Sequence, residues 1–493
     1  MSKHLRQVAF VCAGVVMTPQ AAHARQVTPP GARGVASSAR TSHDAGYPLG
    51  TWQGVLAVGA FRERLALIIR RDSVGTLQGT LRMMDQGGVE LPAAVASHGD
   101  TLSFTIASQH ITYSGVMTTP DDSVRGTFVQ GDRSIPLTFG SSALGSEVVG
   151  RPQDPQPPYP YRAEEVTVPS DSGVRLAGTV VMPAGPGPFP AVVFVTGSGP
   201  QDRDEALMGH RPFLVIADYL ARHGIASLRY DDRGFAKSTG SFETATSADF
   251  AADAEAALHF LQRVPGVARD RVGILGHSEG GLIGPMIAAR TREVAFLVVM
   301  AGPGLPGDSL SLLQVRRLAA GGTSTEQRDS QAEDYRQLYR AVTGARDSVD
   351  AVARLLTAKR QIIAALPEDQ RAAAASRFDR SLPALVSPWM RYFLRYDPRI
   401  ALRSVHVPVL ALGGTLDVQV PATENLSGIA AALQAAGNTD YRVVELPNLN
   451  HLFQTATTGA PSEYATIEET VAPQALDLIT SWINQRFGPN DRP

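Results

Sequence analysis

The chain has 493 residues, a formal net charge of −2, 43% hydrophobic residues and 19% charged residues. This composition is typical of a globular protein with several domains, and it excludes a collagen-like, disordered or coiled-coil chain. The near-neutral charge, without a long basic run, also argues against a nucleic-acid-binding protein.

The N-terminal segment has the layout of a secretory signal peptide. Lys3 and Arg6 give a positive start, a short apolar run follows, and Ala22 and Ala24 form an A-x-A cleavage site. The apolar run is too short to cross a bilayer, although it could also be a buried N-terminal helix. We expect residues 1–24 to be removed, which makes the mature protein secreted or periplasmic.

The single cysteine, Cys12, lies inside this expected signal peptide. The mature chain would therefore contain no disulfide, no cysteine nucleophile and no thiolate metal site. No later segment has about 18 consecutive apolar residues, so we expect no membrane span.

Residues 25–49 are rich in Gly, Ala, Ser and Pro and are expected to form a linker. From residue 50 to 142 the hydrophobic residues alternate with polar ones, as in the run Leu65, Leu67 and Ile69. Turns containing glycine recur between such runs. This pattern predicts a small antiparallel all-β domain of about eight half-buried strands, either a sandwich or a closed barrel.

A proline-rich linker is expected at residues 143–162, because proline favours extended chain. Residues 163–493 then alternate strand and helix patterns, which predicts an α/β domain with a mostly parallel sheet and helices on both faces. Between residues 305 and 402 the apolar residues follow helical spacing instead. We interpret this segment as a helical cap insertion. The expected buried strands are 191–199, 225–234, 271–278, 294–302 and 407–414.

The motif Gly276-His277-Ser278-Glu279-Gly280 is the strongest indication of chemistry. It follows an apolar strand and precedes an expected helix, as a G-x-S-x-G nucleophile elbow requires. The serine must sit in a sharp turn that projects its hydroxyl, and the glycines avoid clashes on either side. The alternative is an ordinary strand-to-helix turn.

A serine nucleophile needs a histidine base and an acid that orients it, in the chain order Ser, Asp or Glu, His. His451 follows an expected strand and is preferred to His406, which precedes one. Asp417 also follows a strand end and is preferred to Asp440, which lies at the start of a strand. We therefore expect Ser278, Asp417 and His451 to form the catalytic triad.

The oxyanion of the reaction needs two N–H donors. One expected donor is the backbone of Glu279, directly after the nucleophile, and the other is that of Ser198, with Gly199 as its rival. The Glu279 side chain could anchor a substrate amine, but we favour an ion pair with an arginine of the cap or of the 201–204 loop. Asp231, Asp232 and Arg233, after another strand, are expected to have a structural role.

These residues give the chain a resemblance to the α/β-hydrolase superfamily, nearest to bacterial serine esterases with a GHSEGG nucleophile motif, often described as serine-aminopeptidase-like hydrolases. The resemblance covers residues 163 to the end and implies hydrolysis of short- to medium-chain acyl esters without a cofactor. One departure is Ala236, where the related D-R-G-x-G-x-S pattern has glycine. The matching stretches are Gly197 to Asp204, Asp231 to Gly234, Lys237-Ser238, Gly276 to Gly281, Asp417 and Asn450-His451.

The sequence thus predicts a serine carboxylesterase that acts on a small-molecule ester through an acyl-enzyme, with no metal and no cofactor. A serine peptidase with the same triad is the alternative. A third hypothesis is a ligand-binding protein that works through the β-domain. The natural substrate and the oligomeric state are not predicted.

Overall fold

A computed structural model describes residues 49–58, 61–72, 75–84, 89–118, 123–130, 133–140, 151–318 and 324–488. The expected signal peptide with Cys12, and nearly all of the expected 25–49 linker, lie outside these ranges. The described chain forms two compact units, one with strands β1 to β8 and the other with β9 to α11. No helix within the described ranges is long and apolar enough to cross a membrane.

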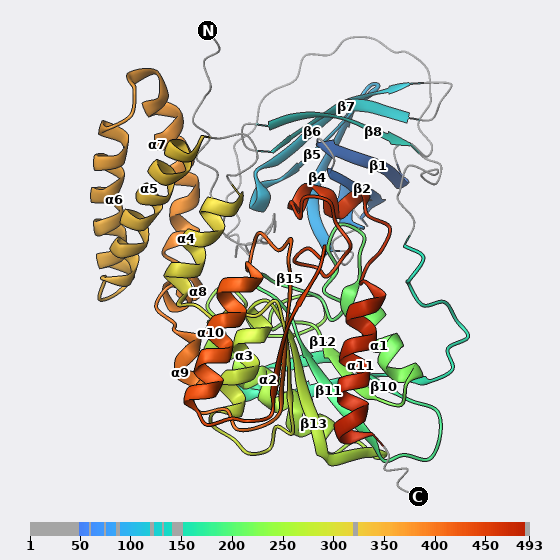
Figure 1. Ribbon diagram of the computed structural model, residues 1–493. Coiled ribbons are helices and arrows are strands. Elements are labelled where there is room, and N and C mark those ends of the chain that lie inside the picture. Colours follow the sequence, from blue (N-terminus) through green and yellow to red (C-terminus); the bar gives the residue numbers. More distant parts are fainter. Residues whose placement is uncertain are drawn as a thin grey trace, which may run out of the picture. The chain divides into compact units, whose positions relative to one another are not determined.

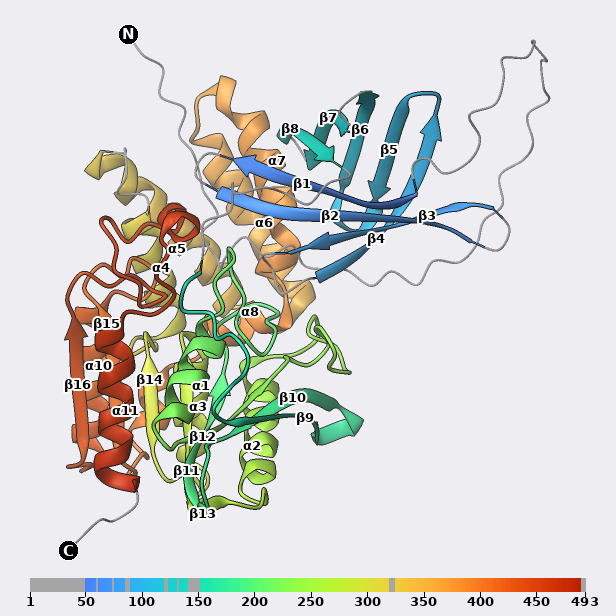
Figure 2. The same ribbon diagram turned by 90° about the vertical axis from the view of Figure 1, so that its right-hand side faces the viewer.

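The first unit is a closed antiparallel barrel of strands β1 to β8 (Figure 2). Alternate side chains point inward, as in β6, where Ile111 and Tyr113 are buried and their neighbours are exposed. The Tyr113 hydroxyl lies 3.0 Å from the Val124 carbonyl and 3.1 Å from that of Leu137. Apolar side chains thus form the core of the barrel, as expected for a small one. The strands are β1 (Gly50–Val58), β2 (Phe61–Arg71), β3 (Leu77–Met83), β4 (Val89–His98), β5 (Thr101–Ile106), β6 (Ile111–Thr118), β7 (Ser123–Gln130) and β8 (Arg133–Gly140).

The second unit contains an eight-stranded sheet in the order β16-β15-β14-β13-β11-β12-β10-β9. Neighbouring strands from β12 across to β16 are parallel, whereas β9 and β10 form an antiparallel edge. This mostly parallel sheet confirms the expected α/β-hydrolase fold class. The strands are β9 (Arg162–Pro169), β10 (Arg175–Met182), β11 (Phe189–Val195), β12 (Ala226–Tyr230), β13 (Val267–His277), β14 (Leu297–Met300), β15 (Val409–Gly414) and β16 (Tyr441–Leu446).

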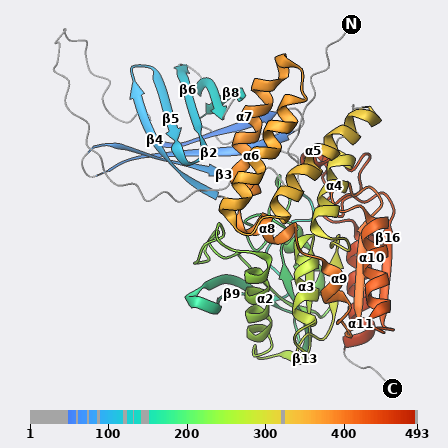
Figure 3. The same ribbon diagram turned by 90° about the vertical axis from the view of Figure 1, so that its left-hand side faces the viewer.

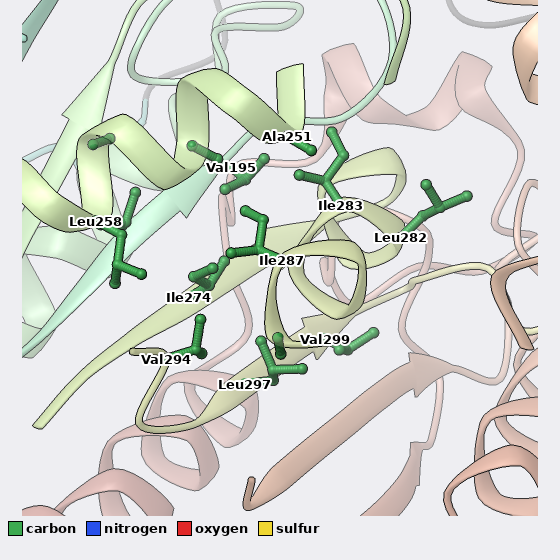
Figure 4. Close-up of a cluster of buried hydrophobic side chains, with 14 of the residues drawn as sticks. Val195, Ala251, Leu258, Ile274, Leu282, Ile283, Ile287, Val294, Leu297 and Val299 are labelled. Carbon is green, nitrogen blue, oxygen red and sulfur yellow. The ribbon is translucent and has the colours of Figure 1, made fainter. Parts of the chain in front are cut away.

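Helices cover both faces of this sheet (Figure 1). In β14, Leu297 and Val299 face one apolar core, and Val298 and Met300 face the other. Figure 4 shows the first core, where helix α3 packs on the strands. Burial on both faces explains the near-continuous apolar runs of these strands. Helices α2 (Ser247–Leu261), α3 (Glu279–Ala288) and α10 (Ala422–Ala435) cover the first face, and α1 (Pro212–Arg222) and α11 (Pro473–Phe487) cover the second.

Six helices are inserted between β14 and β15 and form the cap (Figure 3). The cap has a core of its own that includes Tyr335, Leu355 and Phe378. Phe393, at the end of α8, instead packs in the apolar core between the sheet and helices α2, α3 and α10. The cap helices are α4 (Gly307–Leu318), α5 (Thr325–Thr343), α6 (Ser348–Ala364), α7 (Glu368–Leu385), α8 (Pro388–Phe393) and α9 (Pro398–Leu402).

Candidate active site

The structure gathers the expected site residues at one edge of the sheet. Ser278 follows β13, Asp417 follows β15 and His451 follows β16, and the loop 196–199 follows β11. These strands are parallel, so their carboxyl ends meet at the same edge, where ligands bind in open α/β sheets.

Ser278 occupies a strained turn. Its backbone has φ 52° and ψ −115°, a left-handed conformation that costs a non-glycine residue energy. A Cβ on Gly276 would lie 2.0 Å from the Gly280 carbonyl oxygen, and a Cβ on Gly280 would lie 2.0 Å from that of Val195. Both positions therefore require glycine. The Ser278 N–H donates to the Met300 carbonyl at 2.8 Å, which fixes the turn to β14.

His451 and Asp417 form a buried hydrogen-bonded pair. Nδ1 of His451 lies 2.8 Å from Oδ2 of Asp417. The other carboxylate oxygen, Oδ1, accepts the N–H groups of Gln419 and Val420, each at 2.8 Å. An ionised Asp417 accepts all three bonds, which places the His451 proton on Nδ1 and leaves Nε2 free to act as a base.

The rival residues lie elsewhere. His406 precedes β15 and is exposed, and Asp440 precedes β16 and pairs with Arg486 at 2.7 Å. Both are at the amino ends of their strands, so the structure does not bring them to the carboxyl edge.

Two backbone N–H groups fit the expected oxyanion donors. Glu279 is the first residue of α3, where N–H groups have no partner within the helix. In the loop after β11, the Gly197 N–H already donates to Glu205 Oε1 at 2.7 Å. The Ser198 N–H has no acceptor among the described residues. A Cβ on Gly197 would lie 3.3 Å from the Ser278 Cβ, so this loop lies against Ser278.

Among the described residues, the Glu279 side chain pairs with no arginine, so that expectation was wrong. Its Oε1 accepts the Ser247 hydroxyl at 2.5 Å and the indole N–H of Trp389 at 2.8 Å. Trp389 comes from α8, so the cap supplies a neutral donor where we expected a cation. Burial raises the pKa of the Glu279 carboxyl, and the two hydrogen bonds offset this only in part.

The charged residues after β12 have structural partners. Asp231 pairs with Arg203 at 2.9 Å, and Arg233 pairs with Asp253 at 2.5 Å. Asp232 accepts the Thr196 hydroxyl at 2.9 Å, and burial raises its pKa. The turn that follows these residues is formed despite the missing glycine, since Ala236 itself takes a φ of 47°.

Two functional candidates escaped the sequence reasoning, namely Glu205 and His277. Glu205 lies in the loop between β11 and α1, and His277 directly precedes Ser278. Their side chains meet at 3.0 Å, between Nδ1 of His277 and Oε1 of Glu205. The other ring nitrogen of His277 lies 2.9 Å from the His451 carbonyl oxygen. Only the position of His277 within the motif hinted at a role.

A small hollow, with a cavity volume of about 10 Å³, adjoins the Thr196–Gly199 loop and the start of α3. Its walls combine the aromatic rings of Tyr230, Phe242 and Phe250 with the buried acids Asp232 and Glu279. In the part of the chain that the structure describes, no group of three or more His, Cys, Asp or Glu residues is placed to hold a metal ion.

Several known proteins are similar to parts of this chain. Esterase EstD of Thermotoga maritima is 28% identical over 330 residues, which cover 66% of this chain and 68% of that protein. Mitochondrial acyl-coenzyme A thioesterase 2 of Mus musculus is 31% identical over 128 residues, only 26% of this chain and 25% of that protein. A solved esterase of Pyrococcus furiosus has a TM-score of 0.40 and 14% identity, covering 66% of this chain and 93% of its own.

Residues 172–445, more than half of the chain, match the family model described as X-Pro dipeptidyl-peptidase (S15 family). The matched segment runs from just before β10 to β16 and includes Ser278 and Asp417, whereas His451 lies shortly after it.

Proposed function

We propose that this chain, which belongs to the X-Pro dipeptidyl-peptidase (S15) family of hydrolases, is a serine carboxylesterase that cleaves short- to medium-chain acyl esters through an acyl-enzyme. The observation that carries the proposal is the strained Ser278 turn at the sheet edge where the Asp417–His451 pair also lies. Backbone strain of this kind persists where function requires it.

The proposed reaction has two steps. The Ser278 hydroxyl attacks the ester carbonyl carbon while His451 Nε2 takes its proton, and the N–H groups of Glu279 and Ser198 stabilise the oxyanion. His451 returns the proton to the leaving alcohol as the ester bond breaks. Water then attacks the acyl-enzyme with His451 again as base, and the acid and free serine are released. Asp417 holds the imidazole in the required tautomer throughout.

The loop of residues 196–199 is called the oxyanion loop below. The hollow beside it favours substrates with a small acyl group. Its cavity volume is only about 10 Å³, which leaves little room for a long acyl chain, and three aromatic rings line it. We therefore propose acetyl to butyryl esters as better substrates than octanoyl esters. A series of p-nitrophenyl acetate, butyrate and octanoate, compared by kcat/KM, tests this preference.

A peptidase is the second candidate, because the family model is that of an X-Pro dipeptidyl-peptidase. A dipeptidyl-peptidase must recognise the substrate's amino group. Glu279, the acid next to Ser278 in the chain, is buried and accepts two hydrogen bonds from the protein itself, which favours the esterase. Parallel assays with p-nitrophenyl butyrate and with X-Pro p-nitroanilides decide between them. Turnover of the anilides alone would reject the esterase.

We also propose that the protein is secreted or periplasmic, based on the signal-peptide pattern of residues 1–24. Expression of the full chain in a bacterial host, followed by N-terminal sequencing of the exported protein, should give a new terminus at Arg25. An intact N-terminus on cytoplasmic protein would reject the proposal.

A further inference from the structure

The Glu205–His277 pair connects the two parts of the site that must be aligned for catalysis. Through Oε1, Glu205 accepts the Gly197 N–H at 2.7 Å and lies 3.0 Å from His277 Nδ1. His277 Nε2 lies 2.9 Å from the carbonyl oxygen of His451. One continuous chain of hydrogen bonds thus runs from the oxyanion loop, through the residue next to the nucleophile, to the backbone of the catalytic base.

Glu205 is held firmly in its place. The residue is only 4% exposed, and its backbone takes a φ of 53°, a strained conformation for any residue other than glycine. Its own N–H donates to the Asp202 carbonyl at 2.9 Å. Asp202 Oδ1 also accepts the N–H groups of Asp204 and Ala206, which fixes the loop on both sides of Glu205. The surrounding hydrogen bonds hold Glu205 in its strained backbone conformation, which indicates that the position of its side chain is important for function.

The partners of His277 determine its protonation. A carbonyl oxygen and a carboxylate can only accept hydrogen bonds, so both ring nitrogens of His277 must donate. A neutral imidazole carries one N–H, and only the imidazolium can make both bonds. The buried pair is therefore an ion pair, and each charge is compensated by the other.

We propose that the Glu205–His277 ion pair is a positioning device that holds the oxyanion loop and the His451 backbone in register around Ser278. This inference rests on the proposed function of the Ser278 site. Neither residue touches the reacting atoms in this proposal, since His277 acts through His451, and Glu205 acts through Gly197 and His277.

The charged groups around His277 favour its cationic form. Burial by itself would lower the pKa of His277, but the charge and hydrogen bond of Glu205 raise it above the ordinary value. The His451 carbonyl and the charge of Asp417 act in the same direction. The rings of His451 and Phe453 complete the surroundings, with centroids 4.8 and 6.4 Å from that of His277.

Loss of the Glu205 charge should weaken the stabilisation of the transition state more than it weakens substrate binding. In Glu205→Gln the side chain keeps its shape, but the imidazolium loses its counter-ion and His277 becomes neutral at lower pH. One of its two hydrogen bonds then breaks, and the oxyanion loop and His451 shift relative to Ser278. A misplacement of this kind can reduce the rate about 100-fold.

The kinetic test compares Glu205→Gln with wild type on p-nitrophenyl butyrate from pH 6 to 10. We expect kcat to fall by about 10- to 100-fold with KM almost unchanged, and the alkaline decline of kcat to begin at lower pH. The matched control is Glu293→Gln, which removes a carboxylate 2.6 Å from His259 on the surface. This control should leave both kcat and the pH profile unchanged. A Glu205→Gln enzyme with wild-type kcat and pH profile would overturn the proposal.

A measurement on the unaltered protein covers the case in which Glu205→Gln does not fold. Nitrogen-15 NMR of histidine-labelled protein, assigned with His277→Gln, should show protons on both ring nitrogens of His277 at pH 7.5. A single protonated nitrogen would refute the ion pair. If the wild-type chain hydrolyses no ester, the proposed function fails instead, and that outcome is recognised before any variant is measured.

Discussion

At the scale of single residues, the site depends on a few side chains whose surroundings fix their chemistry. Asp417 accepts three hydrogen bonds, and one of them orients His451. The order of Ser278, Asp417 and His451 along the chain allowed them to be predicted together, because each follows a strand of the same sheet. Glu205 and His277 could not be found in this way. Their contact joins positions 72 residues apart, and no local pattern encodes it.

Asp417→Asn should retain the fold and lose activity. The asparagine oxygen can still accept the N–H groups of Gln419 and Val420, but its amide would favour the wrong tautomer of His451. In a triad this substitution lowers kcat by about 10⁴-fold. The matched control is Asp440→Asn at the opposite edge of the sheet, which should leave kcat unchanged. An Asp417→Asn enzyme within tenfold of wild type would exclude Asp417 from the triad.

At the scale of elements, the backbones of β11, β13 and α3 approach each other closely at the turn that contains Ser278. The cap makes a further contact with the first residue of α3. The glycines of the elbow were predictable, because the motif demands small residues where strand and helix meet. The hydrogen bond from Trp389 to Glu279 was not predictable, since it joins the cap to α3 over 110 residues. The amphipathic pattern of α8 gives no sign of which side chain its tryptophan would meet.

Gly280→Ala should destabilise the second unit. The new Cβ would lie 2.0 Å from the Val195 carbonyl oxygen, so β11 and α3 must separate. Overpacking of this kind costs about 3 kcal/mol of unfolding free energy. Gly284→Ala on the same helix is the control, because its Cβ would meet only side-chain ends, Leu297 Cδ2 at 3.3 Å and Ile274 Cγ2 at 3.5 Å. Urea unfolding should show a loss for the first variant and a change of less than about 1 kcal/mol for the second. Equal effects would refute the packing argument.

Trp389→Phe should lower the free energy of unfolding by more than the smaller buried area of the phenylalanine ring explains. The variant removes one donor from the buried Glu279 carboxylate, and an under-satisfied buried acceptor costs about 1–3 kcal/mol. Trp482→Phe provides the comparison, because the Trp482 indole N–H is buried without a partner among the described residues. Because a carboxylate is the stronger acceptor, we expect the Trp389 variant to lose more free energy of unfolding at a pH above the raised pKa of Glu279 than in acid. If acidic conditions do not reduce this loss, the Trp389–Glu279 hydrogen bond contributes little to the free energy of unfolding.

At the scale of the whole molecule, the change from alternating to continuous apolar runs allowed an all-β unit and an α/β unit to be predicted. The antiparallel edge strands were not predicted individually. β9 is mostly exposed, so it has no hydrophobic run to reveal it. Expected strand limits also differ from the structure, as at β14, which covers Leu297–Met300 where residues 294–302 were expected. Apolar residues in adjoining loops are buried too, and sequence alone does not separate them from the strand.

The stability of the α/β unit should fall as the pH rises above about 6.5, the ordinary pKa of histidine. His277 has a raised pKa, so the folded chain binds its proton more tightly than the unfolded chain does. The resulting stabilisation is complete below the ordinary pKa and disappears as pH passes the raised one. Urea unfolding can be followed by tryptophan fluorescence in a Trp52→Phe background, which leaves Trp389 and Trp482 as reporters. His277→Gln should flatten the decline, and an equal decline in that variant would contradict the prediction.

Covalent labelling tests whether Ser278 is the nucleophile of the proposed reaction. A fluorophosphonate should label the purified wild-type protein at Ser278 alone, as located by peptide mass spectrometry, and esterase activity should vanish in proportion to labelling. Ser278→Ala should stay folded, resist labelling and lose kcat by about 10⁶-fold. Labelling at another residue, or a folded Ser278→Ala enzyme within tenfold of wild-type activity, would contradict the claim.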